Sequence, residues 1–289
     1  MSGHYDTSPS MTGLYVKAAT KRGALADGQT IPRVEATLAP TRPDPAALAE
    51  YRRVCGFVPR DGLPATWPHV LAAPLHLAIL TDPAFPLRPL GIVHTRNRIT
   101  VHEPVPVDAA LGVRCWVEGH RQHRLGVEFD LETEVGLDAR TVWSSTTTIL
   151  ARTRTGGGSK EGRKREAPPQ GEPGGRERST VWRLGADQGR RYAAVSGDYN
   201  PIHLYPLTAR ALGFPRQIVH GMWSLARCVA EIEDDLPEAG WTVSVAFRKP
   251  VLLPTSVLFT AGRDGDIRTF GLRTRDARKV HLEGEIRIG

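Results

Sequence analysis

The sequence has no long apolar run, few cysteines and no metal-binding motif. None of its 289 residues lies in a run approaching the roughly 18 apolar residues that span a membrane. The N-terminus, MSGHYDTSPSMTG, is polar and lacks the apolar centre of a secretory signal. The three cysteines, Cys55, Cys115 and Cys228, form no CxxC pair, so we expect reduced, mostly buried thiols in a cytoplasmic protein. Because HExxH and Cys/His ligand spacings are also missing, no metal is expected.

The composition is that of a globular protein, with 40% hydrophobic and 24% charged residues. A net charge of +7 first suggests nucleic acid or an acidic substrate as a partner. Much of that charge lies in residues 151–179, which are rich in Arg, Lys, Gly and Pro and almost free of large apolar side chains. Such a segment cannot bury enough surface to offset its ordering entropy, so residues 153–178 are expected to form a basic flexible linker. Its GGGSK does not match a phosphate-binding loop, and no recognition helix points to a nucleic acid partner.

Two stretches recur in the same order at nearly the same spacing, which indicates an internal duplication. YRRVCG (51–56) resembles YAAVSG (192–197), and EPVPVDAALGVRCWVEG (103–119) resembles KPVLLPTSVLFTAG (249–262). The expected organisation is an N-terminal, partly flexible segment 1–29, a first repeat 30–152, the linker 153–178 and a second repeat 179–289.

Apolar residues alternate with period two in both halves, which predicts antiparallel strands. The residues expected to share faces are Leu125, Val127, Phe129 and Leu131, then Val243, Val245 and Phe247, then Val280, Leu282, Ile286 and Ile288. Short polar stretches at 136–140, 263–266 and 275–278 predict hairpin turns. The helical spacing of Met222, Leu225, Val229 and Ile232 predicts a helix that packs on the sheet. We therefore expect an α+β fold in which each repeat wraps a curved antiparallel sheet around one long helix.

A polar cluster lies between the two apolar helices expected in the second repeat. Asp198, Asn200 and His203 follow Gly197, which suits the left-handed position that ends a helix. Pro201 disfavours helical backbone at Asn200 and stiffens the loop. The cluster has two interpretations: a capped turn, or a carboxylate–imidazole pair for acid–base chemistry. The unit G-D-x-N-P-x-H is far too specific to arise from average composition, which favours the second.

At these residues the sequence resembles a known family. YAAVSGDYNPIH, followed by GFPRQIVHGM, is similar to the hydratase-2 signature of the MaoC-like (R)-specific enoyl-thioester hydratases and dehydratases. The two-half layout, the basic linker and FRKPVLLPTSV resemble the actinobacterial double hot-dog 3-hydroxyacyl-thioester dehydratases. The resemblance implies a double hot-dog fold and a role in fatty-acid metabolism. The implied reaction is the reversible syn dehydration of (R)-3-hydroxyacyl thioesters to trans-2-enoyl thioesters, with no cofactor beyond the acyl-CoA or acyl-carrier-protein substrate.

The resemblance also assigns roles to individual residues. Asp198 and His203 match the catalytic dyad of the family, and Asn200 matches its loop-orienting position. Gly221 matches the residue whose backbone N–H faces the thioester carbonyl, and a helix N-terminus suits the negative charge that forms there. Which of Asp198 and His203 handles the α-proton stays open.

Other residues are expected to support this site. Ser196, Pro201 and His220 flank the motif, and His220 either hydrogen-bonds the turn that enters the helix or takes a direct chemical part. Arg248 and Lys249 end a strand after the active helix. They either contact phosphates of CoA or of a phosphopantetheine arm, or form a solvated strand end.

The first repeat lacks the chemical groups of the second. Aligning the repeats puts Phe57 at the position of Asp198, and residues 58–68 contain no N-P-x-H. We expect one active site per chain, in the C-terminal half, with the N-terminal half shaping an acyl-chain cavity as the resemblance implies. The alternatives are a non-catalytic acyl-thioester-binding subunit, a thioesterase, or a dehydratase dedicated to a carrier-protein-bound or unusual acyl group. We expect no membrane partner, and either a monomeric pseudo-dimer or a homodimer.

Overall fold

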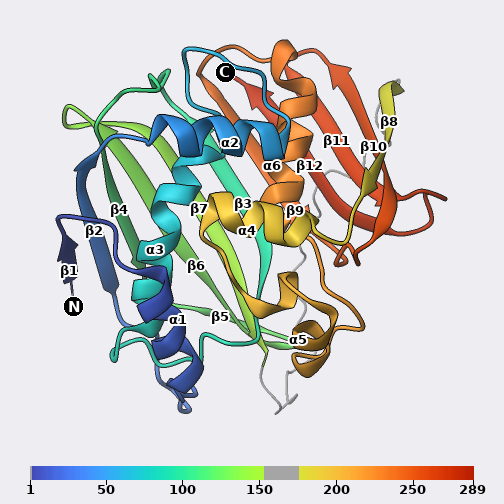
Figure 1. Cartoon of the computed structure of the whole chain (residues 1–289). Coiled ribbons are helices and arrows are strands. Elements are labelled where there is room, and N and C mark those ends of the chain that lie inside the picture. Colours follow the sequence, from blue (N-terminus) through green and yellow to red (C-terminus); the bar gives the residue numbers. More distant parts are fainter. Residues whose placement is uncertain (1, 153–175) are drawn as a thin grey trace. The chain divides into compact units, whose positions relative to one another are not determined.

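The computed structural model describes residues 2–152 and 176–289. The expected linker lies outside the described residues except for Arg176–Arg178, which form the start of strand β8 (Arg176–Leu184) and correct the linker's C-terminal boundary. No helix in the described ranges has the length and apolar character to cross a membrane. Figure 1 shows the elements in chain order.

Contacts divide the chain into two units. Unit 1 comprises Met1–Pro43, Pro68–Asn97 and the described part of Asp108–Arg165, and unit 2 comprises Asp44–Trp67, Arg98–Val107 and the described part of Glu166–Gly289. The contact units differ from the expected repeats, because helix α2 (Pro45–Cys55) has most of its contacts in unit 2. Side-chain packing is the reason: the rings of Tyr51 and Tyr192 lie 6.2 Å apart, and the indole of Trp223 donates to the carbonyl of Val54 at 2.9 Å.

Unit 1 is built on an antiparallel sheet with one parallel edge. The strands follow the order β1-β2-β4-β6-β7, with β5 also pairing β6. Their bounds are β1 Ser2–Tyr5, β2 Val34–Thr41, β4 Leu111–Val117, β5 Arg121–His123, β6 Gly126–Leu137 and β7 Arg140–Arg152. The predicted alternation holds for Val127, Phe129 and Leu131, which are buried. Leu125 is 42% exposed, a correction, because it occupies the turn before β6.

Two helices accompany this sheet. Helix α3 (Trp67–Thr81) is apolar around most of its surface, and its His76 Nε2 lies 2.7 Å from Thr133 Oγ1 on β6, so the helix packs against the sheet. Helix α1 (Met11–Thr20) buries Leu14 and Ala18. The N-terminal segment, expected to be partly flexible, therefore contains a helix with buried side chains and the strand β1, which pairs with β2.

Strand β3 (Ile92–Val101) contributes its first residues to unit 1 and its last to unit 2. The other strands of unit 2 form an antiparallel sheet in the order β9-β12-β11-β10-β8. Their bounds, besides β8, are β9 Trp241–Phe247, β10 Thr255–Asp264, β11 Ile267–Thr274 and β12 Val280–Ile288. The predicted hairpins join β10 to β11 and β11 to β12.

The helical part of unit 2 carries the polar motif. It consists of α2, α4 (Gln188–Ser196), a 3₁₀ turn Pro201–His203, α5 (Pro206–Ala211), α6 (Gly221–Ile232) and a second 3₁₀ turn Glu233–Asp235. On α6 the four predicted residues Met222, Leu225, Val229 and Ile232 are all buried. Both α2 and α4 end at a left-handed glycine, Gly56 and Gly197, which agrees with the aligned repeats. Cys55, Cys115 and Cys228 are free and buried, as expected.

Candidate active site

The end of α4 presents the carboxylate of Asp198. The left-handed backbone of Gly197 ends the helix, so Asp198 begins a non-helical loop. Ser196 Oγ donates to the carbonyl of Tyr192 at 2.8 Å and accepts from the Asp198 N–H at 3.2 Å. Asp198 Oδ1 in turn accepts from the Asn200 N–H at 3.1 Å. The turn interpretation and the chemical one are therefore compatible, because the turn holds the carboxylate in place.

Asn200 and Pro201 carry the chain from this loop to His203. Asn200 Oδ1 accepts from the Ile202 N–H at 3.4 Å and caps the 3₁₀ turn, while Pro201 fills its first position. The carbonyl of Asn200 accepts from the His203 N–H at 3.0 Å. Both residues thus shape the loop between Asp198 and His203.

His203 is a buried, neutral imidazole with a defined tautomer. Its Nδ1 lies 2.8 Å from the carbonyl oxygen of Ile218, which only accepts, so Nδ1 carries the proton and Nε2 keeps its lone pair. The residue is 6% exposed. Burial, and then the neighbouring His220, lower the pKa of His203 to about 3, against the opposing effect of Asp198. At neutral pH, His203 is therefore a base with an available nitrogen.

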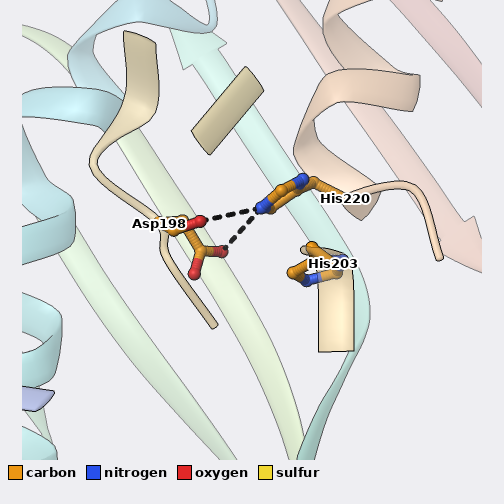
Figure 2. A group of neighbouring side chains, drawn as sticks. All are labelled: Asp198, His203 and His220. Carbon is orange, nitrogen blue, oxygen red and sulfur yellow. Dashed lines mark hydrogen bonds and ion pairs between the residues drawn. The ribbon is translucent and has the colours of Figure 1, made fainter. Parts of the chain in front are cut away.

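His220 connects the loop to the start of α6. A hydrogen bond from the Val219 N–H to the carbonyl of Val251, at 2.9 Å, fixes the entry to the helix. His220 Nε2 then donates to the backbone carbonyl of Asp198 at 2.9 Å and lies 3.8 Å from Asp198 Oδ2 (Figure 2). Burial lowers the pKa of His220 as well. His220 therefore bonds the Asp198 loop across the site, which sequence reasoning did not specify.

The two imidazoles lie one over the other. Their ring centroids are 3.6 Å apart with an angle of 24° between the planes. One ligand atom from each of Asp198, His203 and His220 lies within 4.8 Å of the other two, a spacing that a metal ion could use. The lone pairs of the two stacked imidazoles lie in nearly parallel planes, which does not favour convergence on one ion, and one nitrogen of each ring is engaged with a carbonyl. This arrangement suits proton transfer better than metal binding.

Gly221 begins α6 beside this cluster. Its N–H belongs to the first helical turn, whose N–H groups have no partner within the helix. A Cβ at Gly221 would lie 3.2 Å from the ring of Phe247, closer than the ring tolerates without moving. Glycine therefore lets the aromatic ring at the end of β9 lie against the helix start. Phe247 was expected only as a sheet residue, and alternation gives no signal for this contact.

Gly189 is a second residue that sequence reasoning missed. A Cβ at this position of α4 would overlap the backbone carbonyl oxygen of His203. The helix and the 3₁₀ turn that carries His203 can pack this closely only because residue 189 has no side chain. A glycine inside an otherwise helical stretch was the available signal.

The two basic residues proposed for phosphate contact lie outside the cluster. Arg248 and Lys249 are exposed and directly follow Phe247 in the chain. Arg248 Nε lies 3.3 Å from Glu283 Oε2, so its charge is partly compensated. A phosphate contact at these residues stays a prediction.

Comparison with known proteins agrees with the expected fold and family. A family model described as "MaoC like domain" matches residues 164–285. The chain is 41% identical over 223 residues to 3-hydroxyacyl-thioester dehydratase X of Mycobacterium tuberculosis, covering 77% of this chain and 78% of that protein. It is 27% identical over 232 residues to a peroxisomal enoyl-CoA hydratase 2 of Arabidopsis thaliana, covering 71% of each.

A solved structure of a similar protein has the same fold. The crystal structure of HtdX from Mycobacterium tuberculosis matches with a TM-score of 0.76 and 34% identity, over 88% of this chain and 100% of that one. The α+β architecture is thus the double hot-dog expected from the sequence. The chain belongs to the MaoC-like 3-hydroxyacyl-thioester dehydratases, a family of hydro-lyases.

Proposed function

We propose that this chain reversibly dehydrates (R)-3-hydroxyacyl thioesters to trans-2-enoyl thioesters, with Asp198 and His203 as its catalytic residues. The observation that carries the proposal is a buried neutral imidazole and a carboxylate within 4.8 Å of each other, next to the first turn of α6. The chemistry needs only a base, an acid and an oxyanion donor, and protein groups supply all three.

The proposed reaction begins at the α-carbon. His203 Nε2 accepts the α-proton, and the electron pair of the broken C–H bond forms an enolate whose oxygen faces the Gly221 N–H. The helix N-terminus stabilises this oxygen because its N–H groups and dipole favour negative charge. The imidazolium formed at His203 is stabilised by the carboxylate of Asp198, whose charge opposes the burial that lowers the pKa of His203.

Loss of water completes the cycle. As the enolate collapses to the enoyl thioester, the Cβ–O bond breaks and the leaving hydroxyl takes the proton from the imidazolium. Asp198 holds that hydroxyl by accepting its hydrogen bond. Because both protein groups lie on one side of the substrate, the elimination is syn. His220 holds the loop by its bond to the Asp198 carbonyl, and neither a metal nor a cofactor enters the scheme.

The test compares three variants in hydration of a trans-2-enoyl-CoA. Asp198→Asn and His203→Ala are each expected to lower kcat by about 10²- to 10⁴-fold, the usual contribution of acid–base groups. Asp266→Asn, at an exposed hairpin turn, is the matched control and should retain wild-type activity. Circular dichroism checks that all three remain folded. Near-normal rates in Asp198→Asn or His203→Ala would refute the proposal.

Exchange of the α-proton with solvent distinguishes the proposed role of His203 from that of Asp198. With a saturated acyl thioester in D₂O, the α-proton can exchange although no hydroxyl can leave. His203→Ala should abolish this exchange, whereas Asp198→Asn should retain more exchange than dehydration activity. The reverse pattern would assign the α-proton to Asp198.

A further inference from the structure

Unit 2 has an exposed apolar and basic surface directly beside its catalytic residues. Four of the eight exposed large hydrophobic side chains in the described ranges lie in residues 199–212. They are Tyr199, Tyr205, Leu207 and Leu212, with exposed fractions of 49%, 53%, 78% and 38%. Exposed apolar side chains gathered in one short segment mark an interaction site more often than scattered ones do. We call residues Tyr199 and Tyr205–Arg216 the docking lobe.

Positive charge surrounds these apolar side chains. Arg190 lies over the ring of Tyr205, 5.0 Å from its centroid, and donates to the carbonyl of Leu204 at 2.9 Å. Arg210 and Arg216 are exposed on the lobe, and Arg210 Nε donates to the carbonyl of Pro215 at 3.2 Å. The sequence contains no Asp or Glu from Tyr199 to Ala230. The lobe is thus complementary to an acidic partner.

The lobe is tied to the active site at both ends. It begins beside Asp198 and His203 and ends before His220. Thr208 Oγ1 donates to the carbonyl of Pro201 at 2.6 Å, and the Ile218 N–H donates to the carbonyl of Ile202 at 3.0 Å. Figure 1 shows α5, which carries Leu207 and Arg210, following α4 through this loop. A protein bound on the lobe is therefore held next to the catalytic groups.

Two other occupants fit this surface less well. Residues 153–175 carry an excess of Arg and Lys over Glu and no large apolar side chain, so they complement neither the charge nor the apolar character of the lobe. A second copy of the chain, with a net charge of +7, would bring like charge toward like charge. An acidic protein satisfies both features.

We propose that the docking lobe binds an acidic acyl carrier protein that delivers its acyl thioester to Asp198 and His203 on a phosphopantetheine arm. The inference rests on the proposed function, because a thioester substrate must arrive on either CoA or a carrier. A carrier needs a docking surface within reach of the catalytic groups, and the lobe supplies one. Attraction between a basic surface and an acidic partner raises the rate of encounter and falls with salt.

The test variant is Leu207→Ser/Arg210→Glu/Arg216→Glu, which changes exposed residues outside the catalytic cluster. The matched control is Arg263→Glu/Arg275→Glu, which reverses the charge of two exposed arginines, one near the end of β10 and one in the turn after β11. Each protein is assayed with one 3-hydroxyacyl group carried by holo acyl carrier protein, by CoA and by pantetheine alone. Binding of the holo carrier without an acyl group is measured by surface plasmon resonance at low and high salt.

The lobe variant should raise KM for the carrier-bound substrate by about tenfold or more, because charge reversal at an interface weakens association. Its binding to the holo carrier should fall in parallel and lose salt dependence, while rates on the pantetheine thioester and those of the control stay unchanged. Equal losses of activity on the carrier-bound substrate and on the pantetheine thioester, or no loss on the carrier-bound substrate, would overturn the proposal.

A parallel loss of activity on the CoA thioester would reassign the lobe to phosphate recognition. Sedimentation with phosphatidylglycerol vesicles that the variant abolishes, with carrier kinetics unchanged, would reassign it to a membrane surface. A wild-type chain inactive on all three thioesters would refute the proposed function itself, while carrier binding that depends on the lobe would still stand.

Discussion

At the scale of single residues, the site depends on which imidazole nitrogens carry a proton and on the absence of a side chain at Gly221. His203 donates Nδ1–H to a carbonyl and so offers Nε2, and His220 uses Nε2–H to hold the Asp198 loop. Gly221 has no Cβ, which leaves room for Phe247 against the first turn of α6. Each of these features fixes the position of a proton donor or acceptor rather than adding another reactive group.

Gly221→Ala tests the proposed role of the Gly221 N–H as oxyanion donor. The added Cβ lies 3.2 Å from the Phe247 ring, so either the ring or the helix start has to move. Because alanine favours helix, the fold should persist. We expect kcat to fall by about 10- to 100-fold, somewhat less than complete removal of such a donor.

A second substitution tests whether the loss of kcat in Gly221→Ala comes from the contact between the added Cβ and the Phe247 ring. In Gly221→Ala/Phe247→Leu the smaller side chain should relieve the contact and restore much of kcat, with Phe247→Leu alone as the control. Steady-state kinetics on a trans-2-enoyl-CoA provides the measurement. A Gly221→Ala enzyme with wild-type kcat would remove the helix start from the mechanism.

At the scale of elements, the close packing of α4 on the 3₁₀ turn Pro201–His203 holds the two proposed catalytic residues at a fixed spacing. Asp198 follows the end of α4, and His203 ends the turn. Gly189 is the point of nearest approach, since a Cβ there would overlap the His203 carbonyl. The separation of carboxylate and imidazole is therefore set by backbone packing.

Gly189→Ala should move these two elements apart. We expect the free energy of unfolding to fall by about 1–3 kcal/mol, as overpacking usually costs, and kcat to fall with it. Ala194→Gly, on the exposed side of α4, should cost about 1 kcal/mol through helix propensity alone. Urea unfolding and kinetics at a temperature where both variants are folded make the comparison. Loss of stability without loss of kcat in Gly189→Ala would show that the spacing does not matter.

At the scale of the whole molecule, buried neutral histidines link stability to pH. Burial lowers the pKa of His76 in unit 1 and of His203, His220 and His281 in unit 2. For His203 the ordinary value is 6.5 and the folded value about 3, so between these pH values the unfolded chain binds more protons. The stabilisation is therefore present above pH 6.5 and is lost as the pH falls toward 3.

The His203→Gln variant isolates one of these groups. From pH 6.5 down to pH 4.5 the wild type should lose stability more steeply than His203→Gln, by up to about 1.4 kcal/mol per pH unit, the effect of one proton. His4→Gln, whose side chain is 66% exposed, is the control and should keep the wild-type slope. Urea unfolding at several pH values measures the slopes. Equal slopes in the wild type and His203→Gln would mean that folded His203 titrates like an exposed histidine.

The duplication also belongs to this scale. The aligned tyrosines Tyr51 and Tyr192 pack near each other, and Gly56 and Gly197 end their helices in the same conformation. After Gly56 the chain places Phe57, which is buried and stacked 6.3 Å from Tyr51, where the second repeat places Asp198. At this position one repeat thus carries a carboxylate and the other an apolar ring. One active site per chain stays a prediction.

The sequence determined the features that short-range rules control. Alternation predicted strands β6, β9 and β12, helical spacing predicted the buried face of α6, and glycine placed the ends of α2 and α4. The spacing of Asp198, Asn200, Pro201 and His203 marked the site, because the turn that presents these residues is encoded within a few positions. Leu125 was misassigned because a two-residue turn interrupts the alternation.

Only the tertiary structure decided which distant residues meet. It placed α2 in unit 2 and put Phe247 against Gly221. It also stacked His220 on His203 and left Gly189 no room for a side chain beside His203. Each of these contacts joins residues of different elements, and their closeness depends on packing, which local sequence patterns do not encode. The same holds for the pKa of His203, because burial by the whole fold makes this imidazole a neutral base.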